Sequence, residues 1–124
     1  MEVILDTSFI LTCIKEKIDF LIARDFGNLI LPLQVIDELR QLVEKKKGRE
    51  KNNAKLALDI IETNRTNFKI FELETKHVDS GILNYVKNKE GKIIIATIDK
   101  EMKRKLRGRV RFLVIRAGKK LELV

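Results

Sequence analysis

The sequence predicts an α/β fold, a three-layer α/β/α sandwich with a central, mainly parallel sheet. Strand-like apolar runs alternate with helical patterns along the chain, which is typical of parallel sheets built from crossover units. The run Ile93-Ile94-Ile95-Ala96 contains no polar residue, as expected for a strand that is covered on both faces. At 124 residues, the chain is predicted to form a single domain over residues 1–124.

The first half of the chain predicts two strands and four helices. Residues 2–6 read as a short buried strand that ends at an acid, and residues 29–31 as a second strand. Pro32 stops the second strand and suits the first turn of a helix, because its missing N–H needs no partner there. Helices are expected at residues 9–14, 18–24, 33–47 and 50–64, with Gly48 near the end of the third.

The second half predicts further strand and helix pairs. Residues 68–73 have mixed polarity and are expected nearer the sheet edge. Helices are expected at residues 77–88 and 99–107, and strands at 92–97, 111–115 and 121–124.

Ligands bind at the carboxyl ends of the strands in open sheets of this kind. Acidic residues that directly follow a predicted strand are therefore candidates for a functional site.

The chain is strongly basic, with a net charge of +8. Residues 87–120 carry 13 Lys and Arg against three acids, and a second basic run covers residues 45–55. Such patches favour binding to phosphate backbones, although a charge run alone is also typical of a solvated surface.

The sequence also bears on the cellular setting. Cys13 is the single cysteine, so no internal disulfide can form, which fits a reducing, cytoplasmic environment. The first residues lack the basic segment of a secretory signal, and no apolar run reaches the roughly 18 residues that cross a bilayer.

Four acids stand out against this basic background. Asp6 ends the first predicted strand, and Asp99 lies two residues beyond the strand that ends at Thr97. On a helical projection, Asp79 falls within the apolar arc of its helix, and Glu38 borders the apolar side of its own while Asp37 points away. Together they predict one cluster of carboxylates: Asp6, Glu38, Asp79 and Asp99.

Each acid has a simpler explanation when it is taken alone. Asp6 and Asp99 could cap the helices that follow them, and Asp79 could complement a helix dipole. Glu38 could pair with a nearby Arg or Lys. If the four do cluster, however, their mutual repulsion raises their pKa values, and hard divalent ions such as Mg²⁺ or Mn²⁺ relieve it.

Four segments resemble the motifs of the PIN domain, a small metal-dependent nuclease fold. They are Ile4-Leu5-Asp6-Thr7-Ser8-Phe9, Val35-Ile36-Asp37-Glu38-Leu39, Val78-Asp79-Ser80-Gly81-Ile82-Leu83 and residues 96–104. Their order agrees with the family over essentially the whole chain. Residues 94–115 are most similar to the PIN nuclease of the small-subunit processome, which processes precursor ribosomal RNA, although Val78 stands where those relatives commonly have another acid.

The resemblance implies an endoribonuclease that hydrolyses single-stranded RNA with Mg²⁺ or Mn²⁺. Asp6, Glu38, Asp79 and Asp99 would be the catalytic and metal-binding acids. Ser8 and Thr97 would position a metal-bound water or a carboxylate, or would serve only as caps and strand-end hydrogen bonds. Backbone phosphates would bind Lys103, Arg104, Lys105, Arg107, Arg109 and Arg111.

The resemblance leaves the biological role open. The leading expectation is processing of ribosomal RNA or another RNA maturation step. A second is the toxin ribonuclease of a toxin–antitoxin pair, with a small inhibitory protein as partner, and a third is a non-catalytic RNA-binding scaffold. A homodimer is compatible with all three, and no membrane partner is expected.

Overall fold

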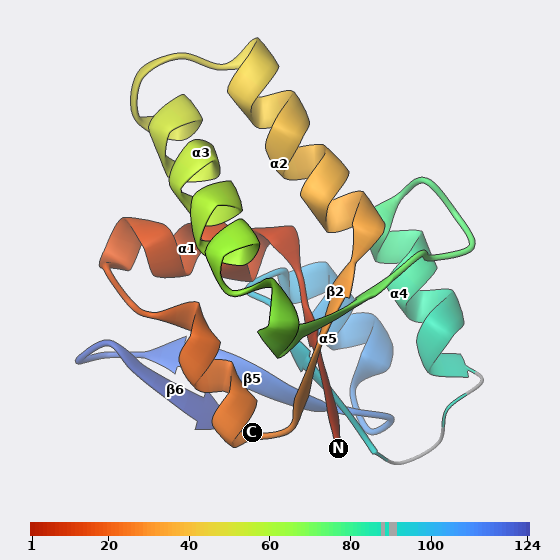
Figure 1. Ribbon diagram of the computed structural model, residues 1–124. Coiled ribbons are helices and arrows are strands. Elements are labelled where there is room, and N and C mark those ends of the chain that lie inside the picture. The colour runs from red at the N-terminus through yellow and green to blue at the C-terminus, as the bar shows by residue number, and fades with distance from the viewer. Residues whose placement is uncertain (88, 90–91) are drawn as a thin grey trace.

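A six-stranded sheet, in the order β3-β2-β1-β4-β5-β6, organises the part of the chain that the structure describes. The structure is a computed structural model and describes residues 1–87, 89 and 92–124 (Figure 1). Neighbouring strands run parallel except for β6, which pairs antiparallel with β5. The strands are β1 Glu2–Leu5, β2 Asn28–Pro32, β3 Phe68–Phe71, β4 Ile93–Ala96, β5 Arg111–Arg116 and β6 Lys120–Leu123.

Helices cover both faces of this sheet, which confirms the predicted three-layer sandwich. The chain moves outward from β1 to β2 and β3, then crosses back to β4 on the other side of β1. Because parallel crossovers are right-handed, this reversal places α1, α2 and α3 on one face and α4 and α5 on the other (Figure 1). The helices are α1 Thr7–Glu16, α2 Leu33–Lys45, α3 Gly48–Thr63, α4 Val78–Lys87 and α5 Lys100–Leu106.

Some local predictions need correction. The short helix expected at residues 18–24 is present as the 3₁₀ helix η1, but it is shifted to Phe20–Asp25, and Asp19 caps it by accepting the Leu21 N–H. Gly48 does not end α2; it begins α3 with a φ of 65°, a conformation that glycine adopts without strain. Pro32 is itself the last residue of β2. The predicted helix end at residue 88 lies outside the described residues.

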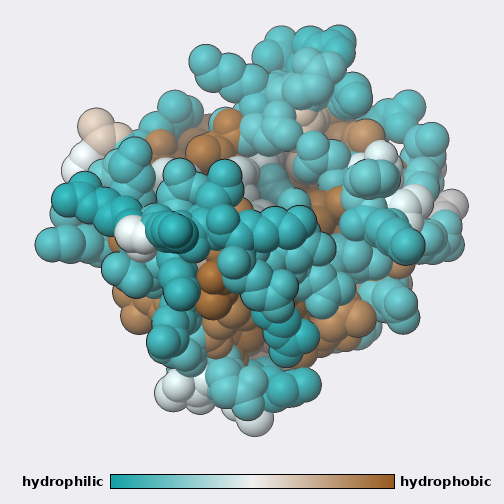
Figure 2. All heavy atoms as spheres, turned by 90° about the horizontal axis from the view of Figure 1, so that it is seen from above, coloured by the Kyte–Doolittle hydropathy of each residue, from teal (hydrophilic) through white to brown (hydrophobic). Residues whose placement is uncertain are grey.

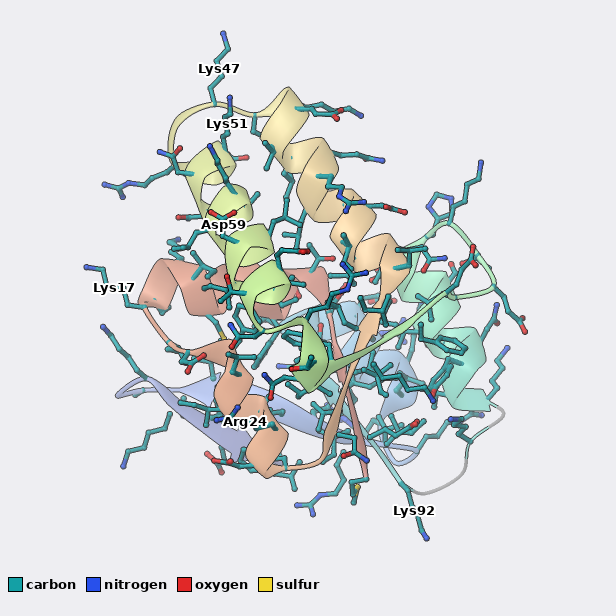
Figure 3. All side chains as sticks on the ribbon, in the orientation of Figure 1. Lys17, Arg24, Lys47, Lys51, Asp59 and Lys92 are labelled. Carbon is teal, nitrogen blue, oxygen red and sulfur yellow. The ribbon has the colours of Figure 1, made fainter. Side chains whose placement is uncertain are left out.

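The core lies between the sheet and its two helix layers. Ile94, Ile95 and Ala96 of β4 are at most 1% exposed, as the apolar run predicted. Cys13 on α1 is also completely buried, and this burial, together with the charge of Asp19, raises the pKa of its thiol to about 12. The face seen in Figure 2 is largely hydrophilic, and the labelled side chains of Lys17, Lys47 and Lys92 point outward from the ribbon (Figure 3).

Within the described residues, the helices are too short or too polar to span a membrane.

Candidate active site

The candidate site lies where the strand order reverses, at the carboxyl ends of β1 and β4. These two strands are direct neighbours, with Leu5 opposite Ala96. Asp6 follows β1, and Thr97 and Asp99 follow β4. In open α/β sheets, the crevice at such a reversal point is the usual ligand site, so the fold places two of the predicted acids at the expected position.

Asp6 is the buried centre of the site, with 4% of its surface exposed. Its Oδ2 accepts hydrogen bonds from Thr97 Oγ1 at 2.7 Å and from Ser8 Oγ at 2.9 Å. Its Oδ1 accepts the Thr7 N–H at 2.9 Å, so Asp6 also caps α1. Burial raises the pKa of Asp6 and the charge of Glu38 adds to this, whereas the three hydrogen bonds oppose it.

Thr97 connects Asp6 to Asp99. The Thr97 hydroxyl donates to Asp6 and accepts the Asp99 N–H at 3.0 Å. The Asp99 Oδ1 in turn accepts the N–H groups of Glu101 and Met102, at 2.9 and 3.3 Å, and so caps α5. The capping roles considered for Asp6 and Asp99 are therefore both observed, and in each case the second carboxylate oxygen does not take part in the cap.

Glu38 reaches the site from α2. Thr7 Oγ1 donates to Glu38 Oε1 at 2.6 Å, which ties the start of α1 to the second turn of α2. The Glu38 residue is exposed rather than internal, and so is Asp37. Both line the same hollow, so the expected contrast between an inward Glu38 and an outward Asp37 is weaker than the helical projection predicted.

Asp79 stands in the first turn of α4 and is exposed. Partial withdrawal from water raises the pKa of its carboxyl, and the nearby charges of Asp6 and Asp99 raise it further; Lys105 acts in the opposite direction. Asp6 is thus affected by the charge of Glu38, and Asp79 by the charges of Asp6 and Asp99. Folding brings residues from four separate sequence motifs to one region of the molecule.

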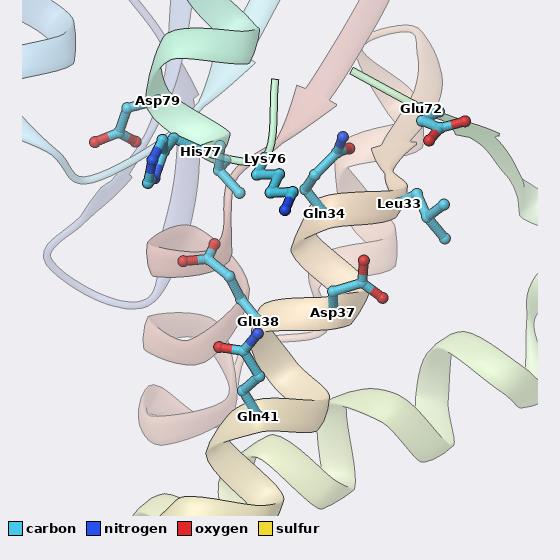
Figure 4. A pocket seen from close by; sticks show the side chains of 10 residues that line it. Leu33, Gln34, Asp37, Glu38, Gln41, Glu72, Lys76, His77 and Asp79 are labelled. Carbon is cyan, nitrogen blue, oxygen red and sulfur yellow. The ribbon is translucent and has the colours of Figure 1, made fainter. Parts of the chain in front are cut away.

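A hollow of about 590 Å³ opens between α2 and the start of α4. Figure 4 shows Glu38 on one wall and Asp79 on the other, with His77 beside Asp79 and Lys76 next to Gln34. Asp6 and Asp99 are not part of the lining; Asp6 lies below the surface. The lining residues are Leu33, Gln34, Asp37, Glu38, Gln41, Glu72, Lys76, His77, Val78 and Asp79.

The chemistry of these donors fits a hard divalent cation. All four are carboxylates, the ligands preferred by Mg²⁺ and Mn²⁺. The pKa values of Asp6 and Asp79 are raised first by burial and then by neighbouring carboxylates, and a bound cation would offset both effects. Among the described residues, no three Asp, Glu, His or Cys side chains already converge into a ligand set. Because Glu38 and Asp79 are exposed, their carboxylates are accessible to an ion from solvent.

The predicted RNA-binding residues follow the site along the chain. Lys103, Arg104 and Lys105 lie on α5, while Met102 and Leu106 of the same helix are buried, as predicted. Arg104 and Lys105 are exposed, and Lys103 is half-buried. Arg104 pairs with Glu101, so part of its charge is already neutralised. Arg107, Arg109 and Arg111 are exposed, and Arg111 begins β5.

Two residues of the site were not found from the sequence. Thr7 follows Asp6 directly and could have been suspected, because a hydroxyl in the first turn of a helix faces the strand end. Gln34 forms hydrogen bonds to Leu73 and Thr75, 39 and 41 residues away, and its partners are backbone groups that carry no sequence signal.

Comparison with known proteins agrees with this fold. A family model described as a PIN like domain matches residues 3–117. The chain is also 32% identical to ribonuclease VapC4 of Methanocaldococcus jannaschii over 130 residues, which cover 98% of this chain and 95% of that protein. The match spans all four acidic motifs and nearly the whole fold, and the chain therefore belongs to the PIN-like domain family.

Proposed function

We propose that this protein is a metal-dependent endoribonuclease that hydrolyses phosphodiester bonds in single-stranded RNA. The observation that carries the proposal is the placement of four carboxylates around the carboxyl ends of β1 and β4, in a chain whose net charge is +8. A basic surface attracts the polyanion, whereas a carboxylate cluster repels it unless cations intervene. The similarity to a ribonuclease supports the same activity.

Each acid has a distinct role in this proposal. Asp6 is held rigidly by Thr7, Ser8 and Thr97 and supplies the fixed ligand. Glu38 and Asp79 approach from the two walls of the hollow, and Asp99 completes the set beside Thr97. Mg²⁺ or Mn²⁺ bound there would activate water and offset the charge that develops on the phosphate.

The basic residues that follow Asp99 hold the RNA. Lys105 already acts electrostatically on Asp79, so a phosphate bound by α5 lies near the acids. Lys103, Arg107, Arg109 and Arg111 extend this basic surface, and Arg104 joins it if the RNA displaces Glu101. These contacts are to phosphates, which bind RNA without reading its sequence.

The test is cleavage of an end-labelled single-stranded RNA with Mg²⁺ or Mn²⁺, compared with the same reaction in a chelator. Asp6→Asn should lower the cleavage rate by about 100-fold or more, because mutation of residues that only hydrogen-bond to metal ligands already lowers metal affinity or activity by about 10- to 100-fold. Asp37→Asn is the matched control, because Asp37 lines the same hollow beside Glu38. Equal cleavage by wild type and Asp6→Asn would exclude this metal site.

Two biological roles are compatible with this activity. The similarity of residues 94–115 to the processome nuclease and the basic stretch support RNA maturation, including ribosomal RNA processing. The toxin role fits at least as well, because the full-length relative is a ribonuclease of similar size. An adjacent upstream gene whose small product blocks cleavage would favour the toxin role, while accumulation of unprocessed ribosomal RNA in a deletion strain would favour maturation.

A scaffold without catalysis is the remaining alternative. It predicts that RNA binds equally well with and without divalent metal, and that the metal leaves the melting temperature unchanged. Asp6 and Asp99 would cap α1 and α5 in a scaffold as well, but a scaffold has no need of the further carboxylates of Glu38 and Asp79 near them, and these favour the enzyme.

A further inference from the structure

We infer that Gln34 and Leu73 form a clamp that sets the span between Glu38 and Asp79, and with it the affinity of the site for a divalent cation. The inference rests on the proposed function and extends it to two residues that do not touch the metal. The clamp joins α2, the segment of residues 72–77 and α4, which together form the walls of the hollow (Figure 4).

Gln34 uses its whole side-chain amide to hold the segment. Its Nε2 donates to the carbonyl oxygens of Leu73 at 2.8 Å and Thr75 at 2.9 Å, and its Oε1 accepts the Leu73 N–H at 3.0 Å. Gln34 lies four residues before Glu38 on α2, which places both on the same side of the helix. The segment is therefore fixed to the helical face that carries Glu38.

From there the network continues into the first turn of α4. The Thr75 hydroxyl donates to the His77 carbonyl at 2.9 Å, and this oxygen also accepts the Gly81 N–H at 2.9 Å. Asp79 lies between His77 and Gly81 in the chain. A displacement of the segment would consequently move the turn that presents Asp79.

Leu73 provides a second, steric connection to α4. Its side chain is 5% exposed and packs against the bare backbone of Gly81. A Cβ atom at position 81 would lie 2.8 Å from both Cβ and Cδ1 of Leu73, closer than such atoms approach one another. Glycine at this position therefore allows the two elements to meet, and a methyl group there would push them apart.

These contacts determine a distance rather than a chemical step. Glu38 and Asp79 belong to opposite helix layers, and the fold alone brings them to one edge without fixing how far apart they stand. Residues that do not bind a metal themselves but orient its ligands typically lower the metal affinity by about 10- to 100-fold when they are mutated. Gln34 and Leu73 are positioning residues in this sense.

The experiment measures the Mn²⁺ dissociation constant by electron paramagnetic resonance of free Mn²⁺, without RNA. Gln34→Ala and Gly81→Ala should each weaken Mn²⁺ binding by about 10-fold or more. Cleavage by both variants should recover toward the wild-type rate as Mn²⁺ is raised to saturation. Gln41→Ala is the matched control, an exposed glutamine on the same helix that lines the same hollow, and should leave the constant unchanged.

A second readout does not depend on metal at all. In the metal-free protein, the Leu73 amide should exchange slowly with deuterium in the wild type and in Gln41→Ala, and faster in Gln34→Ala. Gln34→Met keeps the length of the side chain without its hydrogen bonds, and it replaces Gln34→Ala if circular dichroism shows that the alanine variant does not fold.

The outcomes separate the two proposals. If the wild type binds Mn²⁺ and cleaves RNA while the Gln34 and Gly81 variants bind Mn²⁺ equally well, the clamp is refuted and the proposed function stands. If the wild type neither binds Mn²⁺ nor cleaves, both fall. Weaker Mn²⁺ binding with faster Leu73 exchange in Gln34→Ala supports the clamp.

Discussion

Thr97 donates its hydroxyl hydrogen to Asp6 Oδ2 over 2.7 Å, although 91 residues separate the two in sequence. The bond joins the ends of β1 and β4 where the strand order reverses. Both residues are almost fully buried. The most protected carboxylate of the site is thus oriented by a hydroxyl from the neighbouring strand, and this hydroxyl also receives the Asp99 N–H.

Removing the Thr97 hydroxyl should weaken both the fold and the site. Thr97→Val keeps the shape of the side chain, but it takes a donor from Asp6 and an acceptor from the Asp99 N–H. We expect the free energy of unfolding to fall by about 1–3 kcal/mol, the cost of leaving buried polar groups unpaired, as measured by urea denaturation. Thr97→Ser should lose less, and Thr66→Val at an exposed position should change little.

The pH dependence of stability should reveal Asp6. Burial and Glu38 raise its pKa in the folded state above the ordinary value of 3.8, so the folded protein binds this proton more tightly than the unfolded chain does. The protonated Asp6 carboxyl therefore contributes fully to stability below pH 3.8, and this contribution is lost as the pH rises through the pKa of Asp6 in the folded protein. The Asp6→Asn variant has no titratable group at this position. As the pH rises from 3.8 through the folded pKa of Asp6, the wild type should therefore lose stability relative to this variant.

Urea denaturation at a series of pH values measures this difference directly, because contributions from the other groups are common to both proteins. A difference that stays constant across the window would contradict the raised pKa of Asp6.

Asp79→Asn should have opposite effects with and without metal. Without metal it removes a charge that Asp6 and Asp99 disfavour, so the melting temperature should rise. With Mn²⁺ at 100 times its dissociation constant, the wild type should gain about 2.7 kcal/mol, and the variant should gain much less. Calorimetry without and with Mn²⁺ measures both the expected rise in melting temperature and the smaller stabilisation by the metal. The control variant Asp37→Asn should be stabilised by Mn²⁺ as much as the wild type.

RNA affinity should depend on salt through the basic residues near α5. Arg109→Gln should weaken binding to any single-stranded RNA and reduce the slope of log affinity against log salt by about 0.7, the value for one phosphate contact on a single strand. Fluorescence anisotropy at several salt concentrations measures the slope. Lys51→Gln on α3, in the opposite helix layer, removes the same charge and should leave the slope unchanged.

Much of this fold could be predicted because its signals are local. The isoleucine run predicted β4 and its burial, and the mixed polarity of residues 68–73 predicted a strand near the sheet edge, the position that the slightly shorter β3 occupies. Asp6 and Asp99 could be placed because strand ends in a parallel sheet share one edge. Their helix-capping role is also a local property, readable from the residue type.

What could not be predicted depends on contacts between distant segments. Thr7 meets Glu38 only after α1 and α2 have packed, and Gln34 finds backbone partners that no pattern reveals. The projection correctly turned Asp37 toward solvent, but the exposure of Glu38 escaped it. The projection describes one isolated helix, whereas the segment of residues 72–77 crosses its first turns and creates a hollow that reaches both side chains.

The complete burial of Cys13, with its thiol pKa near 12, gives experimenters a native reporter. Only the thiolate reacts with alkylating reagents, so the folded protein should resist them at neutral pH, and labelling should proceed only through molecules whose interior has opened. The rate of alkylation then follows how often the domain unfolds, and every variant described above can be ranked by it without attaching a probe.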